Sequence, residues 1–338
     1  MLLQLDTIDA DTLLSTPMRK PEFIVEKLLP QGLSILSGAN KIGKSWLMLW
    51  LGICVAKGEP LWDMPTLRSE VLYLCLEDTY ARIQSRLYQL VDEAPPELRF
   101  STVCGTIGDG LEIQIGYEMR RFPSTKLIII DTFQKVRNTS EQAKYGGIYA
   151  ADYNDMSVLK KMADKYQIAI LLVHHLRKLK DSDDPFNEVS GSTGITGAAD
   201  TNMILKRGRG EQSAELIING RDVEYQKLGL LFEDKKWKLT ERMSEEEIRR
   251  EEMPTFLPRL VKFIREREEW TGTATELLAE LDDTVTPANA VTKYLARYSL
   301  EVLVPAGIEY TTRRTGQKRL ITFISNDSCD GCDGESHI

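Results

Sequence analysis

The part of this 338-residue chain that most constrains its fold is a glycine-containing segment at residues 38–45, GANKIGKS. Its spacing, G-x-x-x-x-G-K-[ST], is typical of loops whose backbone N–H groups turn inward around a polyphosphate, because glycine tolerates the backbone angles that this requires. Lys44 is expected to reach the β- and γ-phosphates and Ser45 to hold Mg²⁺ through its hydroxyl. The helix that begins here would point its positive end at the charge. The segment therefore predicts a site for a nucleoside triphosphate.

The neighbouring residues support this interpretation. Residues 32–37 form a short β-type run before the loop, and residues 46–56 form an apolar stretch long enough for a buried helix. Strand, loop and helix thus follow one another in the order that a phosphate-binding loop requires, and the alternative is a glycine turn without a ligand. The residues expected to bind ATP are Gly38, Ala39, Asn40, Lys41, Ile42, Gly43, Lys44, Ser45 and Trp46.

Three further apolar runs, at residues 71–76, 126–131 and 168–173, are typical of buried strands, and an expected helix at residues 157–166 separates the last two. Alternation of strands and helices predicts an α/β fold with a mostly parallel sheet that is covered on both faces. Ligands bind at the carboxyl ends of the strands in such sheets. The polar side chains that follow each run are therefore the candidates for chemistry.

Two of the runs end on carboxylates. Asp131 has the form of an acid that holds Mg²⁺ together with Ser45, and a helix cap is the alternative. Glu77 is the expected general base, because a second carboxylate beside the γ-phosphate has to orient the attacking water. Asp78 competes for that role but is better placed to cap the following helix. The expected cofactors are ATP and Mg²⁺.

The third run ends on His174 and His175, next to the position expected for the γ-phosphate. An imidazole there is able to report the nucleotide state by hydrogen bonding, so both histidines are candidate catalytic residues. A core histidine is the alternative. A separate metal site is disfavoured, because the chain has three histidines in all and no cluster of acidic ligands near this pair.

Composition limits the class of protein. With 42% hydrophobic and 28% charged residues, the chain is able to bury a full core and to carry a second module. A net charge of -8 argues against a generally basic nucleic-acid coat protein but is compatible with a local basic groove. The apolar stretch is too short to span a bilayer, and the first residues lack the pattern of a secretion signal. We expect a cytoplasmic protein without membrane contacts.

The second half of the chain has a different pattern. Short β-type runs between residues 202 and 239 predict an antiparallel extension of the sheet. The expected order is an ATPase domain at residues 1–240, a charged linker or connecting helix at 241–253, a second domain at 254–325 and a disordered tail at 326–338. The tail contains a C-x-x-C pair, but a disordered terminus is favoured over a zinc site because no second ligand pair lies nearby.

In the second domain, expected helices at residues 254–266, 274–281 and 287–298 precede an expected β-hairpin with strands at residues 307–310 and 320–323. This order outlines a winged helix, which places one helix in a DNA groove and hairpin cations on phosphates. Protein contact is the alternative use of such a domain. The residues expected to bind duplex DNA are Lys293, Arg297, Arg313, Arg314, Lys318 and Arg319.

In their order along the chain, these segments resemble the RecA-like ATPases of the plasmid RepA helicase type, which are AAA family ATPases of mobile elements. The similarity spans about residues 21–239 and includes, besides the loop, residues 76–78, 130–133, 173–175 and the glycine-rich residues 191–200. The resemblance implies a RecA-like P-loop core and an ATP-hydrolysing homo-oligomer, a hexameric ring that moves along single-stranded DNA.

Carried over by position, residues 191–199 would be a mobile loop facing the ring channel. Lys206 and Arg207 would be a finger that crosses to the γ-phosphate of the neighbouring subunit, with Arg209 as the alternative. This chain departs from the family at Lys41, which replaces a small residue, and in its channel segment, which lacks aromatic and basic side chains.

We predict a ring-forming DNA motor or replication protein of a plasmid, phage or integrated element. The alternatives are an ATP-switched DNA-binding regulator and a recombination ATPase.

Overall fold

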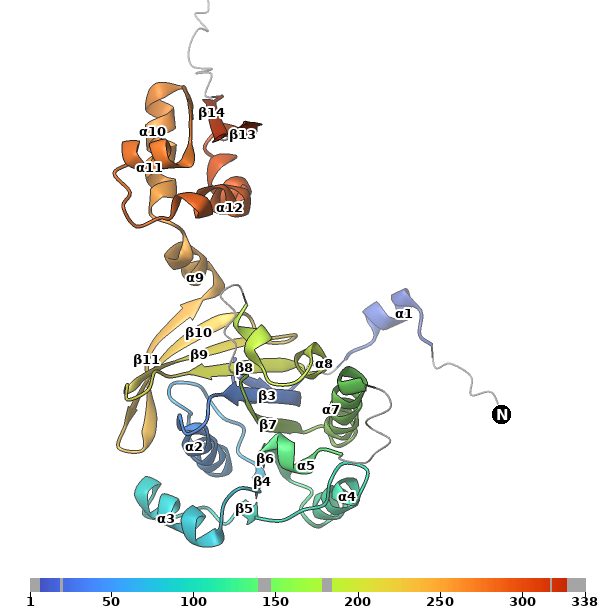
Figure 1. Cartoon of the computed structure of the whole chain (residues 1–338). Coiled ribbons are helices and arrows are strands. Elements are labelled where there is room, and N and C mark those ends of the chain that lie inside the picture. Colours follow the sequence, from blue (N-terminus) through green and yellow to red (C-terminus); the bar gives the residue numbers. More distant parts are fainter. Residues whose placement is uncertain (1–6, 19–20, 139–146, 178–183, 317, 327–338) are drawn as a thin grey trace, which may run out of the picture. The chain divides into compact units, whose positions relative to one another are not determined.

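A computed structural model of the chain has two compact units, Met1–Glu246 and Glu247–Ile338 (Figure 1). The residues that it describes are 7–18, 21–138, 147–177, 184–316 and 318–326. The first unit is built on a nine-stranded sheet, in which the strand order is β11-β10-β9-β8-β3-β7-β6-β4-β5. Each unit has a hydrophobic core of its own.

The strands from β8 to β5 in this order run parallel to one another. Their bounds are β3 Gly32–Gly38, β4 Glu70–Cys75, β5 Leu98–Ser101, β6 Thr125–Asp131, β7 Ala169–His175 and β8 Thr201–Lys206. The helices between them are α2 Lys44–Lys57, α3 Tyr80–Leu90, α4 Leu111–Arg121, α5 Phe133–Val136, α7 Gly147–Tyr166, the 3₁₀ helix Pro185–Glu188 and α8 Thr193–Ala198. The predicted α/β fold with a mostly parallel sheet is confirmed.

Both faces of the parallel strands are buried, which explains why their sequences are continuous apolar runs. In β6, Leu127 and Ile129 join the core that includes α2, whereas Ile128 and Ile130 join the core that includes α4, α5 and α7. Because the strands are parallel, the carboxyl ends of β3, β4, β6 and β7 meet at one edge of the sheet. The polar side chains that the sequence places after these strands therefore lie at that edge.

The predicted antiparallel extension is present as β9 Ser213–Gly220, β10 Gln226–Glu233 and β11 Lys236–Ser244. β11 continues beyond residue 240, and α9 Glu245–Glu252 follows directly, so the segment expected as a linker at residues 241–253 carries regular secondary structure. Near the N-terminus, α1 Ala10–Ser15 precedes a small antiparallel pair, β1 Phe23–Val25 and β2 Leu29–Pro30.

The second unit contains the three expected helices, α10 Phe256–Arg267, α11 Ala274–Glu280 and α12 Ala288–Tyr298, and a short π-helix at Ser299–Leu303. The expected hairpin is formed by β13 Ile308–Thr315 and β14 Lys318–Ser325. A further strand, β12 Glu269–Gly272, pairs with β14 and completes a three-stranded sheet in the order β12-β14-β13. Helices and sheet share one core.

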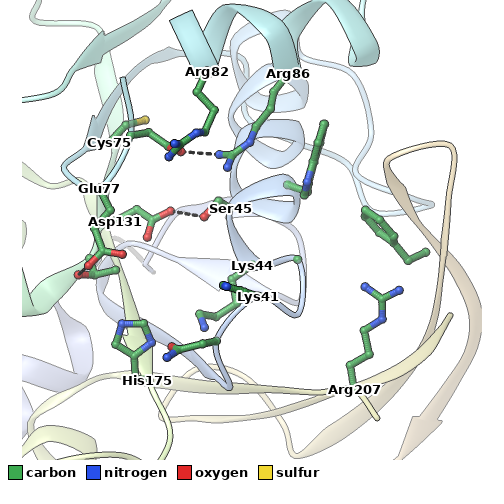
Figure 2. A pocket seen from close by; sticks show the side chains of 16 residues that line it. Lys41, Lys44, Ser45, Cys75, Glu77, Arg82, Arg86, Asp131, His175 and Arg207 are labelled. Atoms are coloured by element: carbon green, nitrogen blue, oxygen red, sulfur yellow. Dashed lines mark hydrogen bonds and ion pairs between the residues drawn. The ribbon is translucent and has the colours of Figure 1, made fainter. Parts of the chain in front are cut away.

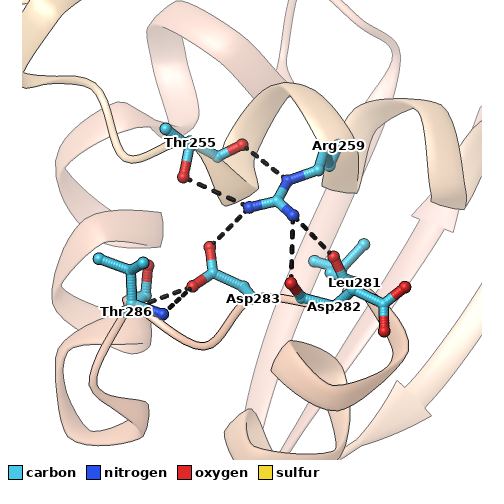
Figure 3. Close-up of polar contacts among 7 residues, drawn as sticks. Thr255, Arg259, Leu281, Asp282, Asp283 and Thr286 are labelled. Atoms are coloured by element: carbon cyan, nitrogen blue, oxygen red, sulfur yellow. Dashed lines mark hydrogen bonds and ion pairs between the residues drawn. The ribbon is translucent and has the colours of Figure 1, made fainter.

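A polar network fixes the segment between α11 and α12 (Figure 3). Arg259, in α10, donates to the backbone oxygens of Leu281 and Asp282 and to the carboxylate of Asp283. The same carboxylate accepts the backbone N–H groups of Val285 and Thr286, at 2.9 and 2.8 Å. Its side chain is completely buried, so these contacts replace water.

Two expectations concern the chain as a whole. Within the residues described above, no helix is both long enough and apolar enough to cross a membrane. The C-terminal C-x-x-C pair, in the tail expected to be disordered, lies outside those residues.

Candidate functional site

The candidate nucleotide-binding loop joins β3 to α2 at the carboxyl edge of the sheet. Lys41 and Gly43 adopt positive φ angles of 62° and 105°, a left-handed conformation that turns successive N–H groups to one side. The Nζ atom of Lys44 donates to the backbone oxygens of Gly38 and Ala39, at 2.7 and 2.8 Å. The ammonium group thus lies inside the loop, where phosphate oxygens are stronger acceptors than these carbonyls.

Ser45 and Asp131, which the sequence assigns to Mg²⁺, lie together (Figure 2). The Ser45 hydroxyl donates to Oδ2 of Asp131 at 2.7 Å, and the hydroxyl of Tyr73, in β4, donates to the same oxygen at 3.0 Å. Burial raises the pKa of Asp131, although the two hydrogen bonds oppose this effect. A hydroxyl and a carboxylate beside a phosphate loop are the oxygen ligands that Mg²⁺ prefers, so these residues fit the ion. The sequence pattern did not indicate Tyr73.

Burial also lowers the pKa values of two basic side chains in the site, Lys44 and His175. It lowers the pKa of Lys44 to about 8, and attraction by Asp131 and Glu77 opposes part of this shift. His175 lines the same pocket, and burial together with the nearby Lys44 lowers the pKa of its imidazole. His175 is therefore neutral at pH 7, able to donate one hydrogen bond and to accept another.

Glu77 and Asp78 have different surroundings although they are adjacent in the chain. Both line the pocket, but they have different partners: Oε1 of Glu77 accepts a hydrogen bond from the hydroxyl of Thr132 at 3.3 Å. Both carboxylate oxygens of Asp78 form ion pairs with α3, one with Arg82 at 2.7 Å and the other with Arg86 at 2.5 Å. These ion pairs hold Asp78 in place and favour Glu77 as the carboxylate available to water.

The two histidines are also separated by the structure. His174 is 3% exposed, its Nε2 lies 2.8 Å from the backbone oxygen of Ser190, and its ring packs edge-on against Phe133. These contacts are those of a core histidine. Since alternate residues of a strand face opposite sides of the sheet, the next residue, His175, is the one directed at the pocket.

Arg207 contacts the nucleotide loop of its own chain, which differs from the expectation that it crosses to a neighbouring subunit. Its NH1 donates to the Ile42 oxygen at 3.2 Å, and its Nε donates to the Glu211 oxygen at 2.7 Å. The guanidinium also lies over the rings of Phe232 and Trp237, at 4.8 and 5.2 Å from their centroids. Neither aromatic residue is predictable from the sequence, because aromatic side chains within β-type runs are usually core residues.

One pocket of about 700 Å³ connects these groups. Its lining includes ten residues that the sequence assigns to the site: Asn40, Lys41, Gly43, Lys44, Ser45, Trp46, Glu77, Asp131, His175 and Arg207. In the described ranges, no group of three or more His, Cys, Asp or Glu residues is arranged to hold a metal ion. An ion at Ser45 and Asp131 would therefore need oxygen ligands from a bound nucleotide and water.

The segment expected to be a mobile loop, at residues 191–199, contains helix α8. The hydroxyl of Ser192 caps this helix by accepting the N–H of Gly194, and the N–H of Ser192 donates to buried Asp152 at 2.7 Å. Ile195 is completely buried. The segment expected to be a mobile channel loop therefore contains a short capped helix, because the cap and the buried Ile195 side chain supply local order that the glycines do not.

The residues expected to bind DNA lie on the surface of the second unit. All six are exposed: Lys293 and Arg297 on α12, Arg313 and Arg314 on β13, and Lys318 and Arg319 on β14. Arg314 and Arg319 are directly opposite each other in the hairpin. Like charges in such a pair repel each other, which a bound anion would relieve.

Similarity to known proteins agrees with this site. A family model described as an AAA domain, AAA_25, matches residues 2–181. One solved structure, of an ATPase domain, is similar with a TM-score of 0.51 at 14% sequence identity, over 62% of this chain and 85% of that chain. A DnaB-like replicative helicase, from a structure that includes its interactions with primase, is similar with a TM-score of 0.50 at 15% identity, over 62% of this chain and 58% of its own. These structures share the fold of a RecA-like ATPase, and no curated protein matches the sequence.

Proposed function

Because this chain belongs to the AAA_25 family of AAA domains and has the fold of a RecA-like P-loop ATPase, we propose that it is an ATP-hydrolysing, ring-forming DNA motor. In this proposal it acts in DNA replication, as a helicase of the plasmid RepA type, in a plasmid, phage or integrated element. The observation that carries the ATPase part is the convergence of Lys44, Ser45, Asp131 and Glu77, from separate segments, on one pocket.

The proposed roles follow from the contacts of each side chain. Backbone N–H groups of the loop and the ammonium group of Lys44 bind the β- and γ-phosphates of ATP, whose γ-phosphoryl group is the one transferred. Ser45 and Asp131 hold Mg²⁺ through their oxygens. Glu77 orients the attacking water and accepts its proton, while Thr132 holds the Glu77 carboxylate. Neutral His175 hydrogen-bonds near the γ-phosphate and senses the nucleotide state.

Self-association into a ring, with six subunits as in the resembled family, is supported by exposed apolar side chains on the first unit. Leu13 and Leu14 of α1 are 45% and 89% exposed, and Val103, Ile113 and Tyr117 line an apolar groove beside α4. Surfaces of this kind are typical of protein interfaces. The similar fold of a replicative helicase supports action on DNA, with single strands in the ring and duplex at the second unit.

A second function, an ATP-switched DNA-binding regulator, is favoured by one observation. The described part of residues 191–199 is a capped helix without cationic or aromatic side chains, whereas exposed cations gather on α12 and the β13–β14 hairpin. Such a protein would bind duplex DNA through its second unit and hydrolyse ATP only as a timer.

Strand displacement distinguishes the two functions. We would measure ATP turnover with and without single-stranded DNA, together with unwinding of a forked duplex and the size of the assembly in solution. The motor is supported if single strands stimulate turnover and the fork is unwound by the unmodified chain but not by the Lys44→Ala variant. Turnover that is indifferent to single strands, without unwinding by an assembled ring, would exclude the motor.

A further inference from the structure

Two backbone carbonyls of the nucleotide loop receive hydrogen bonds from side chains at the antiparallel side of the sheet. NH1 of Arg207, which follows β8, donates to the oxygen of Ile42, and Nε1 of Trp237, in β11, donates to the oxygen of Gly43, both at 3.2 Å. The Gly43 oxygen also accepts the N–H of Leu47, the hydrogen bond that starts α2. The turn of the loop is therefore tied to distant strands as well as to its own helix.

These two bonds determine where two N–H groups point. In a trans peptide the C=O and N–H groups point in opposite directions. The carbonyl of Ile42 shares a peptide with the N–H of Gly43, and the carbonyl of Gly43 shares one with the N–H of Lys44. Holding both carbonyls against the side chains of Arg207 and Trp237 therefore turns both N–H groups the other way, into the pocket that Gly43 and Lys44 line.

The donors are themselves held in place. Trp237 is completely buried, and a Cβ atom at Gly43 would lie 2.9 Å from its Cζ2, so Gly43 packs directly against the indole ring. Arg207 lies over the rings of Phe232 and Trp237 and donates a further hydrogen bond to the Glu211 oxygen. A stacked and doubly hydrogen-bonded guanidinium has lost its rotational freedom before any ligand binds.

We propose that Arg207 and Trp237 form a clamp on the nucleotide loop, in which they act as positioning residues for the N–H groups that bind phosphate in the same chain. This inference rests on the proposed function, since it assumes a nucleotide in the loop. Loop N–H groups cradle the phosphates that ADP and ATP have in common. Loss of the clamp therefore weakens the binding of both nucleotides alike.

The expectation from family resemblance differs in a measurable way. A finger that crosses to a neighbouring subunit stabilises charge on the γ-phosphate during transfer, so its loss lowers kcat and leaves ADP binding unchanged. The affinity for ADP, which has no γ-phosphate, thus separates a clamp within the chain from a finger between chains.

The test uses two variants that keep packing and remove hydrogen-bond donors. Trp237→Phe keeps an aromatic ring without Nε1, and Arg207→Met keeps the apolar stem. We expect each full-length variant to bind Mg-ADP and Mg-ATP about three- to tenfold more weakly in calorimetry, the loss of one hydrogen bond to a carbonyl. The KM for ATP should rise by a similar factor in each variant. The matched controls Trp50→Phe and Lys238→Met, which touch neither carbonyl, keep both affinities.

Results that differ from these expectations would overturn the proposed clamp. Unchanged ADP and ATP affinity in Arg207→Met, with or without a loss of kcat, would leave Arg207 as a finger or a surface residue. Unchanged ADP and ATP affinity in Trp237→Phe would show that Trp237 does not position the loop, and the proposal that the two residues act together would be wrong. If Trp237→Phe does not fold, judged by its melting temperature without nucleotide, Arg207→Met decides. Failure of the unmodified chain to bind either nucleotide would overturn the proposed function itself, and the clamp with it.

Discussion

Lys44 is a buried cation whose charge the proposed site requires. Its pKa of about 8 lies below the value near 10.4 of an exposed lysine, because burial disfavours the ammonium form. A bound polyphosphate stabilises that form. Nucleotide affinity is therefore fully present below pH 8 and lost as the pH rises through that value, by up to about tenfold for each pH unit.

This pH dependence is measurable as the dissociation constant of Mg-ADP between pH 6.5 and 9.5. The matched variant is Lys44→Arg, in which the guanidinium stays charged throughout this range, so whatever affinity it retains should not vary with pH. Equal affinity of the unmodified chain at pH 7 and pH 9.5 would contradict the account.

The adjacent acids Glu77 and Asp78 provide a second test at the scale of single residues. Glu77→Gln keeps the shape of the side chain but removes the base, so we expect kcat to fall at least about 100-fold with ADP affinity retained. Asp78→Asn is the matched control, which weakens the ion pairs to Arg82 and Arg86 and keeps most of the turnover. If the two phenotypes are exchanged in a steady-state assay, Asp78 is the base.

Among the helices and strands, those that could be predicted have a recognisable pattern within their own residues. The loop, the strands before Glu77 and Asp131, and helices α10 to α12 all have a periodicity or a motif of their own. Strand β5 was missed because it is short and only one of its four residues, Leu98, is buried. The order of α8 was missed because it depends on Asp152 in another helix. The direction of Arg207 likewise depends on aromatic residues of β10 and β11, which no local pattern identifies.

The network around Asp283 indicates that one carboxylate contributes to the stability of the second unit (Figure 3). Asp283→Asn replaces an acceptor oxygen by an amide group, so at least one of its three bonds, to Arg259, Val285 or Thr286, is lost. We expect the free energy of unfolding of this unit to fall by about 1–3 kcal/mol. The measurement is native-state amide exchange in α10 to α12, with exposed Asp282→Asn as the control.

The same residue gives this stabilisation a pH dependence. Backbone N–H groups, chiefly that of Thr286, lower the pKa of Asp283 in the folded unit. The stabilisation is therefore present above about pH 4, the pKa of an unfolded aspartate, and is lost as the pH falls through the lower folded value. The Asp283→Asn variant should exchange its amide protons faster than the Asp282→Asn control and the unmodified chain. Equally slow exchange in all three would contradict stabilisation by the Asp283 carboxylate.

In the molecule as a whole, the two units have separate proposed roles. Every group proposed for ATP chemistry lies in the first unit, and the exposed cations proposed for duplex DNA lie in the second. The net charge of -8 did not reveal this division, because it averages a basic hairpin with acidic surfaces elsewhere. The basic hairpin was predictable, since it is continuous in sequence.

Neutralising the hairpin tests this division. Replacing Arg313, Arg314, Lys318 and Arg319 together by Gln should weaken duplex binding and reduce the slope of log affinity against log salt by up to about 3.6, since each phosphate contact releases counterions. Basal ATP turnover should stay unchanged. The control replaces four exposed cations of the first unit, Lys27, Arg68, Lys235 and Lys238. Unchanged duplex affinity and salt slope in the hairpin variant would make the second unit a protein-interaction element.

We propose that the loop after β3 binds ATP for hydrolysis, and the steady-state rate of phosphate release with Mg²⁺ measures this activity. The unmodified chain should hydrolyse ATP, and Lys44→Ala should reduce the rate to background because the cation facing the β- and γ-phosphates is lost. Equal rates in the unmodified and Lys44→Ala chains would contradict the assignment of this loop, and with it the proposed function.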